Sequence, residues 1–128
     1  MTKEILSLDD IKTLVDTFYG KVREDDMLAP IFNRVLQDRW PEHMEKMYTF
    51  WQTILLGERT YNGSPFPPHA RLPISEAHFE RWLELFYQTI DEKFKGDKAE
   101  ESKWRASRIA EVFQSRLDMF REANPFSI

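Results

Sequence analysis

A proline-rich segment separates two long stretches of helical periodicity in this 128-residue chain. The segment, residues 61–73, contains four prolines. Proline fixes φ and lacks a backbone N–H, so the segment cannot form the interior of a helix. We therefore predict a stiff, non-helical loop. It carries one histidine, His69, whose side chain is free to point into the fold.

Before this loop, apolar residues recur at helical spacing in three stretches. Ser7 and Asp10 resemble a capping box. They mark the start of a first helix, which we expect from Leu8 to Arg23. A shorter helix is expected within residues 27–36, because Pro30 suits a first helical turn. A third helix is expected to start near Pro41 and to end at Gly57.

After the loop, the pattern predicts two more helices. Ser75 is placed to cap the fourth helix, and Gly96 is expected to close it. Asp97 with Glu100 is typical of the start of a fifth helix. The sequence shows no alternating strand pattern and no internal repeat. We therefore predict an all-α fold in a single domain spanning residues 1–128.

Composition narrows the classes of function. Hydrophobic residues make up 41% and aromatic residues 14%, which predicts a core rich in flat rings. These aromatic rings could line a binding pocket for a planar ligand, or they could pack against one another in the core. The net charge of −4 argues against nucleic acid or an anionic membrane surface as a partner. Neither a signal core nor a run of membrane-spanning length is visible, so we expect a cytoplasmic protein.

The chain has no cysteine, which excludes disulfides, thiolate metal sites and thiol nucleophiles. Metal ligands must then come from histidine, carboxylates or a cofactor. A non-haem metal enzyme is disfavoured, because His43 and His69 lack a third ligand at a recognisable spacing. By pattern alone, His69 is more often a solvated side chain than a ligand, and the rings are more often core.

An ordered set of residues along the chain favours a ligand-binding interpretation. The set is Phe18-Tyr19, Pro30-Ile31-Phe32-Asn33, His43, Phe50-Trp51, Leu55-Leu56-Gly57, Tyr61-Asn62-Gly63, His69, Trp82-Leu83 and Leu85-Phe86. With these residues in this order, the chain resembles the truncated, two-over-two haemoglobins, and most closely their third group. The likeness spans nearly the whole chain, and the chain lacks the glycine-pair motifs typical of the first two groups.

The resemblance implies a globin-like sandwich of helices in which the Pro-rich loop replaces most of the proximal helix. It implies haem b (iron protoporphyrin IX) as the cofactor, with His69 as its axial ligand and as the metal site. On the opposite, distal side it places Tyr19 and Trp82 as hydrogen-bond donors to bound dioxygen. His43 is expected there too, either contacting the ligand or gating its entry, and it could instead swing into solvent when protonated.

Further residues are expected around the haem. Phe32 matches the phenylalanine that stacks against the macrocycle, and Met47 matches an apolar position above its plane. Lys46 or Arg71 could pair with the haem propionates. We assign no function to His78, the remaining histidine.

The resemblance implies binding of dioxygen, nitric oxide and carbon monoxide at ferrous iron. Two reactions are then open: dioxygenation of nitric oxide to nitrate, or peroxidase-like cleavage of a peroxide. No flavin or nicotinamide motif is present, so either reaction needs an external reductase. The alternatives are a non-catalytic sensor or storage globin and a haem-free helical interaction domain.

Overall fold

The computed structural model describes residues 2–58 and 74–123. Over these ranges the chain forms five helices and no strand, and an isolated parallel bridge pairs Lys3 with Phe94. The predicted all-α fold is confirmed. The Pro-rich loop at residues 61–73 falls outside the described ranges. The helices are α1 (Leu8–Glu24), α2 (Ala29–Leu36), α3 (Trp40–Leu56), α5 (Glu76–Lys93) and α6 (Asp97–Ala123).

Local capping signals account for most of the helix ends. The Ser7 side chain accepts a hydrogen bond from the Asp10 backbone N–H, and the Asp10 carboxylate accepts one from the Ser7 N–H in return. This is the predicted capping box, which satisfies N–H groups that have no partner within the helix. Pro30 and Pro41 stand in the first turns of α2 and α3, and α3 ends before Gly57, which adopts the left-handed conformation.

The prediction that Gly96 closes the fourth helix is wrong, because α5 ends at Lys93. The next residue, Phe94, is extended and buried, and the chain pairs there with the N-terminal segment. The Lys3 N–H donates to the Lys93 carbonyl at 3.2 Å, and the Lys95 N–H donates to the Lys3 carbonyl at 2.9 Å. These bonds give the backbone partners that another helical turn would otherwise supply.

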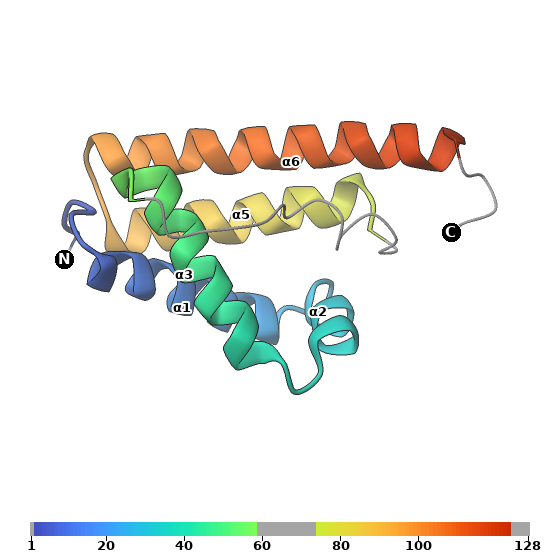
Figure 1. Cartoon of the computed structure of the whole chain (residues 1–128), viewed down its shortest axis with the longest axis horizontal. Coiled ribbons are helices and arrows are strands. Elements are labelled where there is room, and N and C mark those ends of the chain that lie inside the picture. The colour runs from blue at the N-terminus through green and yellow to red at the C-terminus, as the bar shows by residue number, and fades with distance from the viewer. Residues whose placement is uncertain (1, 59–73, 124–128) are drawn as a thin grey trace.

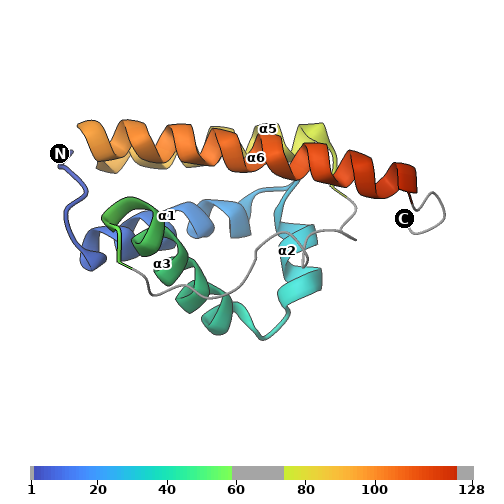
Figure 2. The same cartoon turned by 45° about the horizontal axis from the view of Figure 1, so that its top comes forward.

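The helices form two pairs that pack on each other (Figures 1 and 2). In one pair, α5 and α6 run antiparallel, joined by a short turn. In the other pair, α1 lies against α3 and also packs on α5, so it links the two pairs. The short helix α2 follows the end of α1 and leads into α3. None of the described helices is long and apolar enough to cross a membrane.

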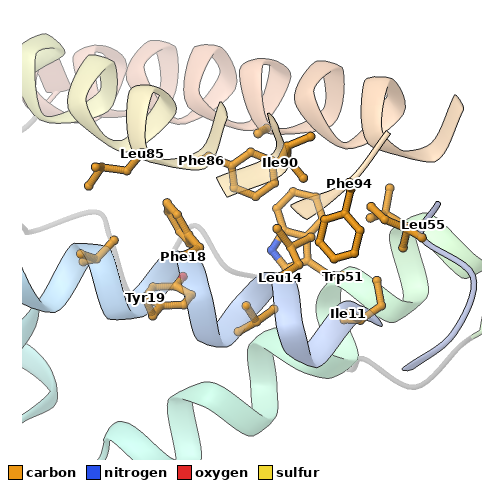
Figure 3. Close-up of a cluster of buried hydrophobic side chains, with 14 of the residues drawn as sticks. Ile11, Leu14, Phe18, Tyr19, Trp51, Leu55, Leu85, Phe86, Ile90 and Phe94 are labelled. Carbon is orange, nitrogen blue, oxygen red and sulfur yellow. The ribbon is translucent and has the colours of Figure 1, made fainter. Parts of the chain in front are cut away.

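The main core lies where α1, α3 and α5 meet. Figure 3 shows Phe18 of α1 facing Phe86 of α5, with Trp51 of α3 beside them. Phe18 and Phe86 are 1% and 0% exposed. Full burial of one such side chain contributes roughly 1.5–3 kcal/mol, so a cluster of this size fixes the relative positions of the three helices. Those positions set the geometry of the site.

The corner between α1 and α2 is held by Asp25. Its carboxylate accepts the backbone N–H groups of Met27 and Leu28 at 3.1 and 3.0 Å, and it accepts the Arg81 Nε–H of α5 at 2.6 Å. Burial alone would raise the pKa of Asp25, but the hydrogen bonds from Arg81 and Leu28 outweigh it and hold this pKa below its usual value. Asp25 therefore ties the start of α2 to α5, next to Trp82.

Candidate functional site

A cleft opens where the two helix pairs meet, and side chains from all five helices line it. Its empty space, the open mouth included, is about 840 Å³. The walls are mainly apolar, with polar groups from only a few side chains. Walls of this kind suit a flat, largely apolar molecule. The rings that line the cleft include Tyr19, Phe32, Phe50, Trp51, Trp82 and Phe113.

Tyr19 lies on the buried face of α1 and is 5% exposed. Its ring meets Phe18 and Phe32 edge-on, with centroids 4.8 and 5.9 Å apart. Burial raises the pKa of the Tyr19 hydroxyl, so the group stays protonated at neutral pH and can donate. Among the described residues, no hydrogen bond uses this hydroxyl. Tyr19 lines the cleft, so a group bound there can accept a hydrogen bond from this hydroxyl.

Trp82 lines the same cleft from α5 and is half-buried. Its indole stacks on Phe86 at 5.8 Å and 18°, and the edge of Phe18 meets it at 5.6 Å and 87°. On the side of α3, Trp51 stacks on Phe86 at 5.1 Å. The core rings therefore fix the plane of Trp82. Within residues 2–58 and 74–123, its indole N–H makes no hydrogen bond and remains available as a donor.

His43 stands in the first turn of α3, and its ring lies inward. It meets Tyr19 edge-on at 5.0 Å and 88°, Trp40 at 5.8 Å and 86°, and Phe32 at 6.3 Å and 64°. The sequence left open whether this side chain turns into the fold or into solvent. In this structure it is half-buried on the wall of the cleft, next to Tyr19.

The other predicted site residues divide into three groups. Phe32 and Met47 line the cleft, and their contact with a macrocycle stays a prediction. Lys46 is exposed on α3 and is not part of the lining, so its pairing with a propionate stays a prediction. His69 and Arg71 lie outside the described residues, and their roles also stay predictions.

Sequence reasoning missed two residues of this region. His78 also lines the cleft, and it is the third residue of α5. Its Nδ1 accepts the Ser75 backbone N–H at 3.0 Å, so histidine stands where Glu or Gln usually completes a capping box. The Ser-x-x-His spacing is visible in the sequence. The second residue is Trp40, which packs against several of the rings that line the cleft. No local sequence pattern predicts this position.

The donor set in the cleft suits a haem better than a bare metal ion. No group of three or more His, Asp or Glu side chains that could hold a metal occurs among the described residues. The cleft instead combines apolar rings with the Tyr19 hydroxyl and the His43 imidazole. An apolar macrocycle can use such rings, while a small ligand bound to it can use such polar groups.

Comparisons with known proteins identify the family. The model of the bacterial-like globins matches residues 4–114. The chain belongs to the bacterial-like globin family. It is 37% identical over 121 residues to the group 3 truncated haemoglobin of Campylobacter jejuni, covering 91% of this chain and 95% of that protein.

A solved structure agrees with this membership. The crystal structure of the group III truncated haemoglobin from Campylobacter jejuni superposes with a TM-score of 0.84 at 37% identity, covering 91% of this chain and 95% of that chain. The predicted globin-like fold and the predicted resemblance to group III truncated haemoglobins are therefore confirmed. Membership of the globin family implies haem-based binding of diatomic gases. It argues against the haem-free alternative.

Proposed function

We propose that this globin binds haem b in the cleft, that His69 would hold its iron, and that Tyr19, Trp82 and His43 would face the bound gas. The observation that carries the proposal is the convergence of these three side chains on one apolar cleft, where Tyr19 presents a buried, protonated hydroxyl. When bound, the haem supplies a ferrous iron that takes up the gas and exchanges electrons.

The chain's own residues set the polarity that the gas meets. A bound gas that carries partial negative charge would be stabilised by a hydrogen-bond donor already in place. Tyr19 and Trp82 are two such donors, held by rings packed around them. They need little reorganisation on binding, since the core fixes their positions. The apolar walls keep water from competing for the same acceptor.

We infer that a pocket with two hydrogen-bond donors suits a reaction of the bound dioxygen better than oxygen delivery, because delivery requires that the dioxygen dissociate easily. The favoured reaction is the dioxygenation of nitric oxide, in which NO, O₂ and one electron give nitrate. The electron comes from an external reductase. Reduction of a peroxide with the same reductant is the related second reaction. Slow gas release without turnover would instead favour a sensor or storage role.

The first test is the ultraviolet-visible spectrum of the protein with stoichiometric haemin, before and after dithionite and carbon monoxide. We expect a sharp Soret band that shifts to a histidine-ligated carbonyl form. His69→Ala should lose this form. His78→Ala removes another histidine of the cleft and should keep the form if His69 is the residue that holds the iron. A spectrum indistinguishable from free haemin would refute the proposal.

The second test measures nitrate production after rapid mixing of the oxygenated protein with nitric oxide. The Tyr19→Phe, Trp82→Phe double variant should be slower than the wild type. The matched control makes the same two changes outside the cleft, at Tyr48 and at the exposed Trp104. If the cleft variant and the wild type produce nitrate at the same rate, these donors do not support the reaction.

A further inference from the structure

Trp40, the first residue of α3, stands behind the ligand side of the cleft. It does not line the cleft, yet it contacts three rings that do. Its ring stacks on Phe32 at 6.1 Å and 22°, and it meets Tyr19 at 6.1 Å and 67° and His43 at 5.8 Å and 86°. The buried Trp40 ring therefore packs against the Phe32 ring, the Tyr19 ring and the His43 imidazole at once.

Trp40 is itself held from two other directions. Its indole N–H donates to the Asn33 side-chain oxygen of α2 at 3.1 Å. The Arg23 guanidinium of α1 lies 4.6 Å from the centre of its ring, which is cation–π distance. The ring is 6% exposed. It cannot turn without breaking the hydrogen bond or leaving its stack on Phe32.

Trp40 and His43 are neighbours on the surface of α3. Residues three positions apart lie on the same side of a helix, so the Trp40 ring forms one wall of the space that the His43 imidazole occupies. Tyr19 and Phe32 form two further walls. If Trp40 moves, that space widens, and His43 gains other rotamers that the packed rings now exclude.

We propose that Trp40 is a positioning residue that holds the His43 imidazole inside the cleft next to Tyr19, and that its hydrogen bond to Asn33 sets how often His43 occupies this position. The inference rests on the proposed function, because it concerns the ligand-facing side of the same cleft. On this proposal, the hydrogen bond between Trp40 of α3 and Asn33 of α2 influences the polarity around the bound gas.

The test uses the infrared C–O stretch of the carbonyl complex of the holoprotein, which reports the polarity around the bound gas. His43→Leu marks the band of a pocket without the imidazole. Asn33→Ala removes the hydrogen-bond acceptor but leaves the Trp40 ring, and Trp40→Phe keeps a smaller ring without the donor. The matched control is Trp104→Phe, since Trp104 is 58% exposed on α6.

We expect Asn33→Ala and Trp40→Phe to move intensity from the wild-type band toward the His43→Leu band, whereas Trp104→Phe should leave the spectrum unchanged. The loss of one neutral hydrogen bond corresponds to a change of roughly two- to tenfold in the ratio of the two states. If Trp40→Phe does not fold, Asn33→Ala decides the test, because it leaves the core ring intact.

Two results would overturn the proposal. Wild-type band ratios in Asn33→Ala and Trp40→Phe, with a shifted band in His43→Leu, would mean that Trp40 only fills space, even if urea unfolding shows a loss of stability. An unchanged band in His43→Leu would mean that His43 does not face the gas. Failure of the wild type to form any carbonyl complex would instead refute the proposed function.

Discussion

Replacing Tyr19 by Phe removes one hydroxyl from the cleft and leaves the aromatic ring in place. The ring is 5% exposed and packs edge-on against Phe18 and Phe32 through contacts that phenylalanine can also make. The hydroxyl has no hydrogen-bond partner among the described residues. Tyr19→Phe should therefore leave the stability of the haem-free protein nearly unchanged and weaken gas binding.

The two effects have sizes that can be estimated. In the haem-free protein the variant loses no hydrogen bond within the described residues, so its free energy of unfolding should stay within about 1 kcal/mol of the wild type's. In the gas-bound protein the same hydroxyl donates to a partly charged oxygen, an interaction of about 1.5–3 kcal/mol. Its loss should speed oxygen dissociation by roughly 10- to 100-fold.

Two measurements separate these effects. Urea unfolding of the haem-free protein, followed by circular dichroism, gives the free energy of unfolding. Displacement of oxygen by excess carbon monoxide in a stopped-flow instrument gives the rate of oxygen dissociation. The matched control is Tyr48→Phe, whose lost hydroxyl donates to Asp16 outside the cleft. We expect the control to lose up to about 1 kcal/mol of stability and to keep the wild-type oxygen dissociation rate.

Either of two results would contradict this reasoning. A loss of more than about 1 kcal/mol in haem-free Tyr19→Phe would mean that the hydroxyl already has an internal partner. An oxygen dissociation rate equal to that of the wild type would mean that Tyr19 does not donate to the gas. The second result would also weaken the proposed nitric oxide chemistry, which depends on the same donor.

Three further predictions concern the fold. Gln37 has a φ of 50°, a region that favours glycine, so Gln37→Gly should raise the free energy of unfolding by about 0.5–1 kcal/mol in urea. Gly57 has a φ of 72°, so Gly57→Ala should lower it by about 1 kcal/mol, although an added Cβ would meet no atom within 4 Å. Asp25→Asn should lower it by roughly 1–3 kcal/mol at neutral pH, because Arg81 and the start of α2 lose a charged acceptor. Since the folded pKa of Asp25 lies below its unfolded value of about 3.9, its contribution is present above that value and is lost as pH falls through the folded pKa. The variant should therefore lose less stability than the wild type in urea titrations from neutral pH down to about pH 3.

The sequence predicted most helix ends because their signals are local. The Ser7–Asp10 capping box, the proline in the first turn of α3 and the left-handed Gly57 each act within three or four residues. The exception is α5. Its end depends on pairing with Lys3, a residue close in space but remote in sequence, and no local pattern contains that information.

The sequence also predicted only part of the candidate site. Periodicity showed that Tyr19 and Trp82 lie on apolar helix faces, but it could not distinguish a ring in the core from a ring on a cleft, and only the resemblance to a family singled them out. The structure places both on one cleft together with His43. The roles of His69 and Arg71 rest on the resemblance alone, since neither is among the described residues.

By itself, the sequence determined which segments form helices and which face of each is apolar, because helical spacing and capping are local properties of the chain. Only the tertiary structure decided which apolar rings face the cleft and which support them from behind. Phe86 and Trp40 are both buried aromatic residues behind the cleft, yet Phe86 stacks on Trp82 of α5, whereas Trp40 stacks on Phe32 of α2. That difference arises from the way α1, α2 and α3 pack on one another, and packing joins residues that are distant in the chain.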